Sequence, residues 1–259
     1  MLRVLQLTDT HLRPASREDD PPIDVAAATH CFTGESTVDR AAAVVAAALG
    51  RCGRHRLDLV LHTGDLTESG GEEGCAAGAV LLDKLGAPYL VAPGNHDCLT
   101  ELEAGLGDRV ASTVRHHDIG RWRVIVCNTA RQGEHQGVFP AETLAELDEL
   151  LACGRPVLLG CHHPPLSPCG DPTCVVANSW ELLDVLDRHG NVRAVVSGHL
   201  HLADEIERAG VRYLLSPATS LQLRHRHPLA DSNKGATPAG ARLLHLHDDG
   251  SVGTELVWV

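Results

Sequence analysis

Five short polar clusters of this chain each follow a run of apolar, often β-branched residues. They are Asp9-Thr10-His11, Gly64-Asp65, Gly94-Asn95-His96-Asp97, His162-His163-Pro164-Pro165 and Gly198-His199-Leu200-His201. Asp, Asn and His are poor strand formers, but they are good metal ligands and good loop residues. Open α/β sheets bind their ligands at the carboxyl ends of strands. Five clusters at five strand ends therefore predict one site along the rim of a sheet.

The clusters together offer seven oxygen and nitrogen donors. These are Asp9, His11, Asp65, Asn95, His162, His199 and His201. Seven donors are too many for one tetrahedral ion, but they suit two ions that share a carboxylate and keep open positions. Asp65 is the best candidate for the shared ligand, because it lies centrally in the ligand order. Two ions about 3.5–4 Å apart would lower the pKa of a water between them and hold a phosphate ester for in-line attack. A donor set without thiolate suits Mn, Fe, Zn or Co and does not choose between them.

Two further residues of these clusters are predicted to be catalytic. His96 follows the ligand Asn95, so it is expected to reach the substrate and to stabilise or protonate the leaving oxygen. Asp97 is expected to orient the imidazole of His96, and a helix N-cap is the alternative role for its carboxylate. Any one of these residues, seen alone, would more often be a cap or a core histidine. The ordered set is what predicts a metal site.

The elements that must position the clusters alternate along the chain. Apolar runs predict strands at 2–8, 57–63, 88–92, 110–115, 121–127, 156–161 and 192–197; propensity and spacing predict helices at 38–50, 72–86, 99–106, 141–152 and 179–189. Two hairpins are expected near the C-terminus, 203–208 with 211–215 and 242–247 with 252–258. No repeat or linker interrupts the pattern. We therefore expect residues 1–259 to form a single domain of two packed sheets with helices outside.

Composition narrows the function classes. The 259 residues carry a formal charge of −12, which argues against a nucleic-acid surface. An acidic protein can still bind a phosphate substrate if bound cations reverse the local sign. The nine cysteines are scattered and form no Cys-x-x-Cys pair, so the sequence indicates neither a disulfide framework nor a zinc knuckle. Without a signal peptide or an apolar run of membrane-spanning length, the protein is expected to be cytoplasmic, with no membrane partner.

In this order, the clusters resemble the calcineurin-like metallophosphoesterase superfamily over residues 2–202. Within it, His162 to Leu166, Gly198 to His201 and Ser216 to Gln222 resemble the bacterial class III cyclic nucleotide phosphodiesterases of the Icc/CpdA type. The resemblance implies an α/β fold, a four-layer αββα sandwich of two mixed β-sheets flanked by helices. It implies a first metal on Asp9, His11, Asp65 and His201, and a second on Asp65, Asn95, His162 and His199. His162 is preferred to His163 because the family's ligand stands two residues before the proline, and His96 matches the catalytic histidine.

The resemblance also implies a reaction. It is hydrolysis of 3′,5′-cyclic nucleotides, with cAMP favoured, by a metal-bridging hydroxide while His96 assists the leaving group. The alternative is a broader phosphoesterase that acts on 2′,3′-cyclic nucleotides, other phosphodiesters or phosphomonoesters. A non-catalytic binding scaffold is disfavoured, because no ligand of the pattern is missing. The expected cofactors are two Mn, Fe or Zn ions, and the expected partner is a small phosphate ester, with a homodimer left open.

Several features stay open at this point. The acidic stretch 13–33 is longer than in typical members and could cover the site, which leaves substrate size undecided. His163 could support the ligands or only pack in the core. Arg131 could reach a substrate phosphate or stay solvated. Ser216 to Gln222 could pack behind the ligands or touch the substrate.

Overall fold

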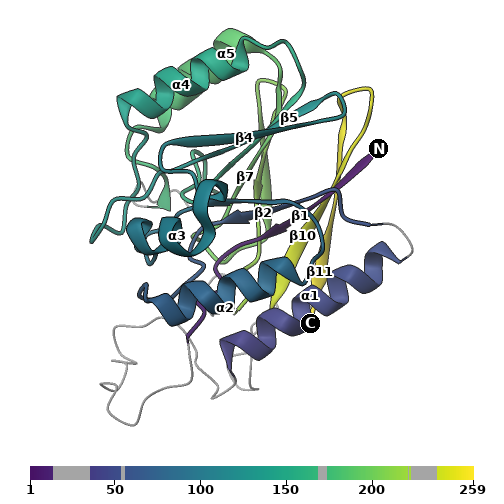
Figure 1. Cartoon of the computed structure of the whole chain (residues 1–259). Helices are drawn as coiled ribbons and strands as arrows, with labels where there is room; N and C mark the ends of the chain where they lie inside the picture. The colour runs from purple at the N-terminus through teal and green to yellow at the C-terminus, as the bar shows by residue number, and fades with distance from the viewer. Residues whose placement is uncertain (14–35, 54–55, 169–173, 221, 223–237) are drawn as a thin grey trace.

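The computed structural model describes residues 1–13, 36–53, 56–168, 174–220, 222 and 238–259. Two β-sheets pack face to face in it, and helices cover both outer sides (Figure 1). The first sheet has the order β11-β10-β1-β2-β3, with β1 Leu2–Leu7, β2 Leu59–Thr63, β3 Tyr89–Ala92, β10 Gly240–Leu246 and β11 Val252–Trp258. The second has the order β4-β5-β6-β7-β9-β8, with β4 Val114–Ile119, β5 Trp122–Cys127, β6 Val157–Cys161, β7 Val192–Ser197, β8 Asp204–Arg208 and β9 Val211–Leu215.

The helices divide between the two outer layers. They are α1 Thr37–Cys52, α2 Glu72–Asp83, α3 Leu99–Leu106, α4 Ala141–Leu151 and α5 Ser179–His189, with a 3-10 turn at Gly107–Arg109. Figure 1 shows α1 and α2 against the first sheet, and α4 with α5 on the far side of the second sheet. The predicted four-layer sandwich of two mixed sheets flanked by helices is confirmed.

Period-two alternation along the strands builds this layering. In β2, Leu59 and Leu61 face the second sheet and share a buried apolar cluster with Val124 of β5, whereas Val60 joins the cluster under the helices. In β6, Leu158 faces inward and Leu159 packs beneath the second helical layer. Each central strand is therefore apolar on both faces, which is why these strands read as continuous hydrophobic runs.

Strand direction brings the polar clusters to one rim. β1, β2 and β3 run parallel, and so do β5, β6 and β7. The five clusters follow the carboxyl ends of β1, β2, β3, β6 and β7. The C-terminal hairpin completes the first sheet, because β10 pairs antiparallel with β1. That pairing supports a single domain, which stays a prediction.

One predicted strand is displaced. The expected strand near 110–115 lies instead at Val114–Ile119 and forms a hairpin with β5 around Gly120, whose φ is +54°. Val110 makes only an isolated bridge to Val91 of β3. β4 is an edge strand with alternating exposed residues, so its polar stretch Arg115 to Asp118 carries little apolar signal. Within the described residues, no helix is long and apolar enough to cross a bilayer.

Candidate dinuclear metal centre

The backbone is strained where the strands end. Asp9, His11, Asp65, His199 and His201 all have positive φ, between +45° and +68°. Side-chain-bearing residues rarely adopt this left-handed conformation, and where they do the strain is commonly stored at functional sites. Five of the seven predicted ligands therefore sit on backbone that turns sharply out of its strand.

Glycines in the clusters let the ligand loops approach one another. A Cβ on Gly94 would lie 2.1 Å from Asp65 Oδ1, and a Cβ on Gly198 would lie 1.9 Å from Thr8 Oγ1. A Cβ on Gly64, whose φ is +93°, would meet the ring of His162 at 2.4 Å. The loop after β2 thus packs directly against the loops after β3 and β6, with no space for a side chain between them.

One group of donors gathers around Asp9. His201 Nε2 lies 3.3 Å from Asp9 Oδ1 and 3.2 Å from His11 Nε2. Asp65 Oδ2 is 3.7 Å from His11 Nε2. The potential ligand atoms of Asp9, His11 and His201 all lie within 4.8 Å of one another. These atoms could hold one ion.

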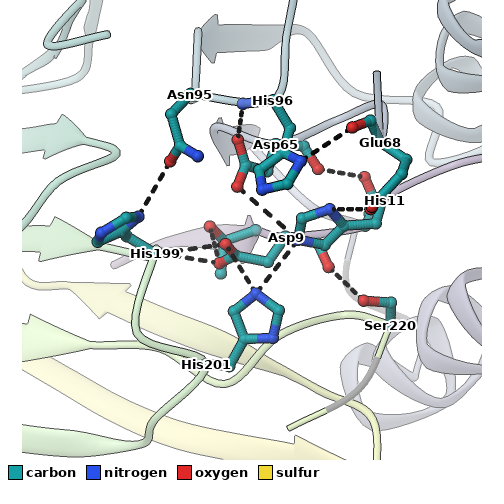
Figure 2. A network of polar contacts seen from close by, with 12 residues as sticks. Asp9, His11, Asp65, Glu68, Asn95, His96, His199, His201 and Ser220 are labelled. Atoms are coloured by element: carbon teal, nitrogen blue, oxygen red, sulfur yellow. Dashed lines mark hydrogen bonds and ion pairs between the residues drawn. The ribbon is translucent and has the colours of Figure 1, made fainter. Parts of the chain in front are cut away.

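A second group lies on the other side of Asp65. His162 Nε2 is 3.3 Å from Asp65 Oδ2 and 3.1 Å from Asn95 Oδ1. His199 Nδ1 lies 3.0 Å from the same Asn95 oxygen, and Figure 2 shows these two side chains facing each other. Asp65 therefore stands between two sets of donors, as expected for a shared ligand.

Polar contacts on the far side of the rings decide which nitrogens are available. His11 Nδ1 forms an ion pair with Glu68 Oε2 at 2.7 Å, and His162 Nδ1 donates to the Thr63 carbonyl at 2.8 Å, so each of these nitrogens carries a proton. Each ring then turns an Nε2 lone pair toward Asp65. Lone pairs and carboxylates that converge in this way repel one another unless a cation or a proton lies between them. The donor set therefore suits metal ions.

The shifted pKa values of the site agree with a set of donors suited to metal ions. Burial alone would raise the pKa of Asp9, but His201 outweighs it and the pKa falls to about 2. The pKa of Asp65 is also held well below its usual value, against the effect of burial, mainly by His162. Burial is likewise overcome at His11, by Glu68, and at His162, by Asp65, so that both histidine pKa values rise to about 9. In the metal-free protein, protons on these two rings take the place of cations.

His96 lies beside the first group, from the loop after β3. Its backbone N–H donates to Asp65 Oδ1 at 2.9 Å, and its ring meets that of His11 edge to face at 4.8 Å (Figure 2). Its Nδ1 donates to the Glu68 carbonyl at 2.9 Å. Glu68, which the sequence reading missed, thus contacts both histidines. The available signal was an acidic residue three positions after the ligand Asp65.

Asp97 has neither role expected of it. Its carboxylate accepts from the backbone N–H groups of Leu66, Thr67 and Gly94 at 2.9–3.2 Å. The N-cap of α3 is Cys98, without a side-chain bond to the helix. Consecutive residues of a tight turn point apart, so Asp97 faces the loop after β2 while His96 faces the rim. It joins two ligand loops and does not contact the His96 imidazole that it was expected to orient.

The structure also locates the features left open. His163 is buried beside His162 and His199, and the three rings offer ligand atoms within 4.8 Å of one another, but its Nδ1 lies 2.9 Å from Thr129 Oγ1 and its Nε2 donates to the His135 carbonyl at 3.1 Å. Arg131 is exposed and pairs with Glu134 at 3.6 Å. Ser220 Oγ donates to the Asp9 carbonyl at 2.7 Å, so its segment packs behind a ligand (Figure 2). Of the stretch 13–33, all but Arg13 lies outside the described residues.

Comparison with known proteins defines the class. A model of the calcineurin-like phosphoesterase family matches residues 2–203, so the chain belongs to that family and is a phosphoesterase. It is 34% identical over 208 residues to a 3′,5′-cyclic-nucleotide phosphodiesterase of Nostoc sp., covering 78% of this chain and 77% of that protein. It is 29% identical over 261 residues to the 3′,5′-cyclic adenosine monophosphate phosphodiesterase CpdA of Escherichia coli, covering 98% and 89%.

A solved structure supports the fold. A dimetal phosphatase from Danio rerio matches with a TM-score of 0.70 at 15% identity, covering 98% of both chains. The predicted family, sandwich fold and hydrolase class are confirmed by these comparisons. The family fold implies a dinuclear centre, and the two donor groups around Asp65 suit it.

Proposed function

We propose that this enzyme hydrolyses 3′,5′-cyclic nucleotides, with cAMP preferred, at a centre of two metal ions. The observation that carries the proposal is the position of Asp65 between two groups of donors, with His96 against the first group. Similarity to 3′,5′-cyclic nucleotide phosphodiesterases over 77–89% of their lengths supports the substrate class.

The donors divide between the ions as their distances suggest. The first ion takes Asp9, His11, Asp65 and His201, and the second takes Asp65, Asn95, His162 and His199. When bound, the ions supply an activated water and positive charge that offsets the phosphate. Oxygen and nitrogen donors suit Mn, Fe or Zn, and elemental analysis of the purified protein identifies which are bound.

His96 acts on the leaving group. Its Nδ1 donates to a backbone carbonyl, which can only accept, so Nε2 is the nitrogen that exchanges its proton. Hydrolysis of the cyclic diester breaks one bond from phosphorus to a ribose oxygen. That oxygen takes the proton from His96 Nε2 as it leaves, and the phosphorus gains a hydroxyl group from water.

Turnover of three substrates tests the proposal. Mn²⁺-loaded protein is assayed with 3′,5′-cAMP, 2′,3′-cAMP and a phosphomonoester, and kcat/KM is compared. We expect the highest value for 3′,5′-cAMP. Equal or higher values for the other two would replace the proposal with a broad phosphoesterase that uses the same residues.

Other properties expected from the sequence stay predictions. They are a cytoplasmic location, a possible homodimer, and the lack of nucleic-acid and membrane partners. Cell fractionation tests the location, light scattering tests the oligomeric state, and binding assays with DNA and vesicles test the partners.

A further inference from the structure

We propose that Glu68 is a positioning residue whose carboxylate orients His11 for the first ion while its backbone carbonyl orients His96 for the leaving group. This inference rests on the proposed function, because it assumes that His11 binds the first ion and that His96 acts on the leaving group. Glu68 itself is not one of the seven donors. Glu68 belongs to the loop after β2, three residues beyond Asp65, and is partly buried, with 18% of its side chain exposed.

The backbone of Glu68 is held on two sides. Its N–H donates to the Leu12 carbonyl at 3.4 Å, and the preceding Thr67 forms a bridge with Leu12. Asp97 accepts from the Thr67 N–H at 2.9 Å and from the Thr67 hydroxyl at 3.0 Å. The backbone of Glu68, which carries both its carboxylate and its carbonyl group, is therefore held in place between the loops after β1 and β3.

The carboxylate acts on the metal ligand. The ion pair between His11 Nδ1 and Glu68 Oε2, at 2.7 Å, favours a proton on Nδ1 and leaves Nε2 on the side of His201 and Asp65 (Figure 2). Arg13 Nη2 lies 3.7 Å from the other oxygen, Oε1, and steadies the carboxylate. A carboxylate that holds the outer nitrogen of a ligand histidine sets its tautomer and raises its basicity toward the metal.

The carbonyl acts on the catalytic histidine. It accepts from His96 Nδ1 at 2.9 Å, which leaves Nε2 for proton exchange. Since the rings of His11 and His96 pack edge to face at 4.8 Å, each limits the rotation of the other. The two functions of Glu68 can be separated by substitution, because a change of side chain removes the carboxylate and leaves the carbonyl.

The test measures metal binding without substrate. Isothermal titration of metal-free Glu68→Ala with Mn²⁺ is expected to show one site weakened about 10–100-fold and the other unchanged. Glu68→Gln, which keeps a neutral acceptor and the size of the side chain, is expected to recover part of the loss. Glu72→Ala, an exposed acid at the start of α2, is the matched control and should bind like wild type.

Two further measurements sharpen the assignment. At saturating Mn²⁺, kcat of Glu68→Ala should fall far less than its metal affinity, because His96 keeps its carbonyl partner. The double variant with Asn95→Ala should hold neither ion tightly, since the two changes act on different sites.

Wild-type affinity at both sites in Glu68→Ala and Glu68→Gln would overturn the inference and leave the proposed function intact, as would equal weakening of both sites. Wild-type protein that binds no Mn²⁺ would instead overturn the proposed function.

Discussion

At the scale of single residues, the role proposed for His96 is to act on the leaving group and not to bind a metal ion. Its ring bonds to the Glu68 carbonyl and packs against the ring of His11, and its backbone N–H donates to Asp65. We expect His96→Ala to keep both ions and to lose about 10²–10⁴-fold in kcat, the usual contribution of a general acid. Elemental analysis and steady-state kinetics measure the two effects. His116→Ala, on the exposed side of β4, is the control. A fully active His96→Ala variant would remove this residue from the mechanism.

Asn95 is proposed as a ligand of the second ion only, so a change of this residue tests the division of donors between the ions. Its Oδ1 lies 3.1 Å from His162 Nε2 and 3.0 Å from His199 Nδ1. We expect Asn95→Ala to weaken chiefly one ion, by at least the roughly 10–100-fold that is typical when only an outer-shell partner of a ligand is lost. Mn²⁺ titration followed by elemental analysis measures the effect. Two tightly held ions in this variant would contradict the placement of Asn95.

Some residues of the site can be predicted from the sequence and others cannot. That the seven candidate donors gather at one rim could be predicted, because the clusters that carry them follow apolar strands. Glu68 and Asp97 could not be assigned, since their partners depend on the path of the loops. Asp97 adjoins His96 in sequence, but its carboxylate accepts from the backbone of Leu66, Thr67 and Gly94.

At the scale of elements, the close contact of the loops after β2 and β3 needs a glycine. A Cβ on Gly94 would lie 2.3 Å from the backbone nitrogen of Asp65, which a side-chain movement cannot relieve. We expect Gly94→Ala to destabilise the fold by about 1–3 kcal/mol, the usual cost of overpacking, and to weaken both ions because Asp65 moves. Denaturant unfolding and Mn²⁺ titration measure these effects.

The control for this prediction comes from helix α1. Gly50 has open space around its Cβ position and no positive φ, so Gly50→Ala should stabilise the protein by about 0.5–1 kcal/mol through helix propensity. A Gly94→Ala variant as stable as wild type, with both ions retained, would show that the loops can separate without loss.

The order of helices and strands along the chain can be predicted where apolar runs and turn residues agree. The order of the strands within each sheet cannot. The hairpin of β8 and β9 follows from Ala209 and Gly210, which both take positive φ. The position of this hairpin in the sheet cannot be predicted from its own residues. It depends on the parallel pairing of β9 with β7, which is separate from the antiparallel pairing of β9 with β8. The predicted position of β4 is wrong because its exposed, polar residues lack the apolar alternation by which a strand is recognised.

At the scale of the whole molecule, a buried polar network ties the two sheets together below the site. Ser216 Oγ donates to Gln6 Oε1 at 2.5 Å, and Arg242 Nε donates to Ser216 Oγ at 3.0 Å. Arg242 is 4% exposed, and burial lowers its pKa to about 10. The network joins β1 and β10 to the segment that leaves β9. It depends on the register that places Gln6 opposite Arg242, which local sequence does not reveal.

Metal binding by the whole protein is expected to be coupled to the release of protons. With both histidine pKa values raised to about 9, His11 and His162 are protonated at pH 7 in the metal-free protein, and the Nε2 atom of each ring must lose its proton to bind a metal. We expect loading with Mn²⁺ at pH 7 to release about two protons, and the apparent affinity to rise with pH and level off above about pH 9. Titration calorimetry in two buffers of different ionisation enthalpy counts the protons, and a repeat at pH 10 is the control, where release from these rings should nearly vanish. No net release at pH 7 would mean that the rings already face the rim as neutral ligands, so that no protons stand in for the cations there.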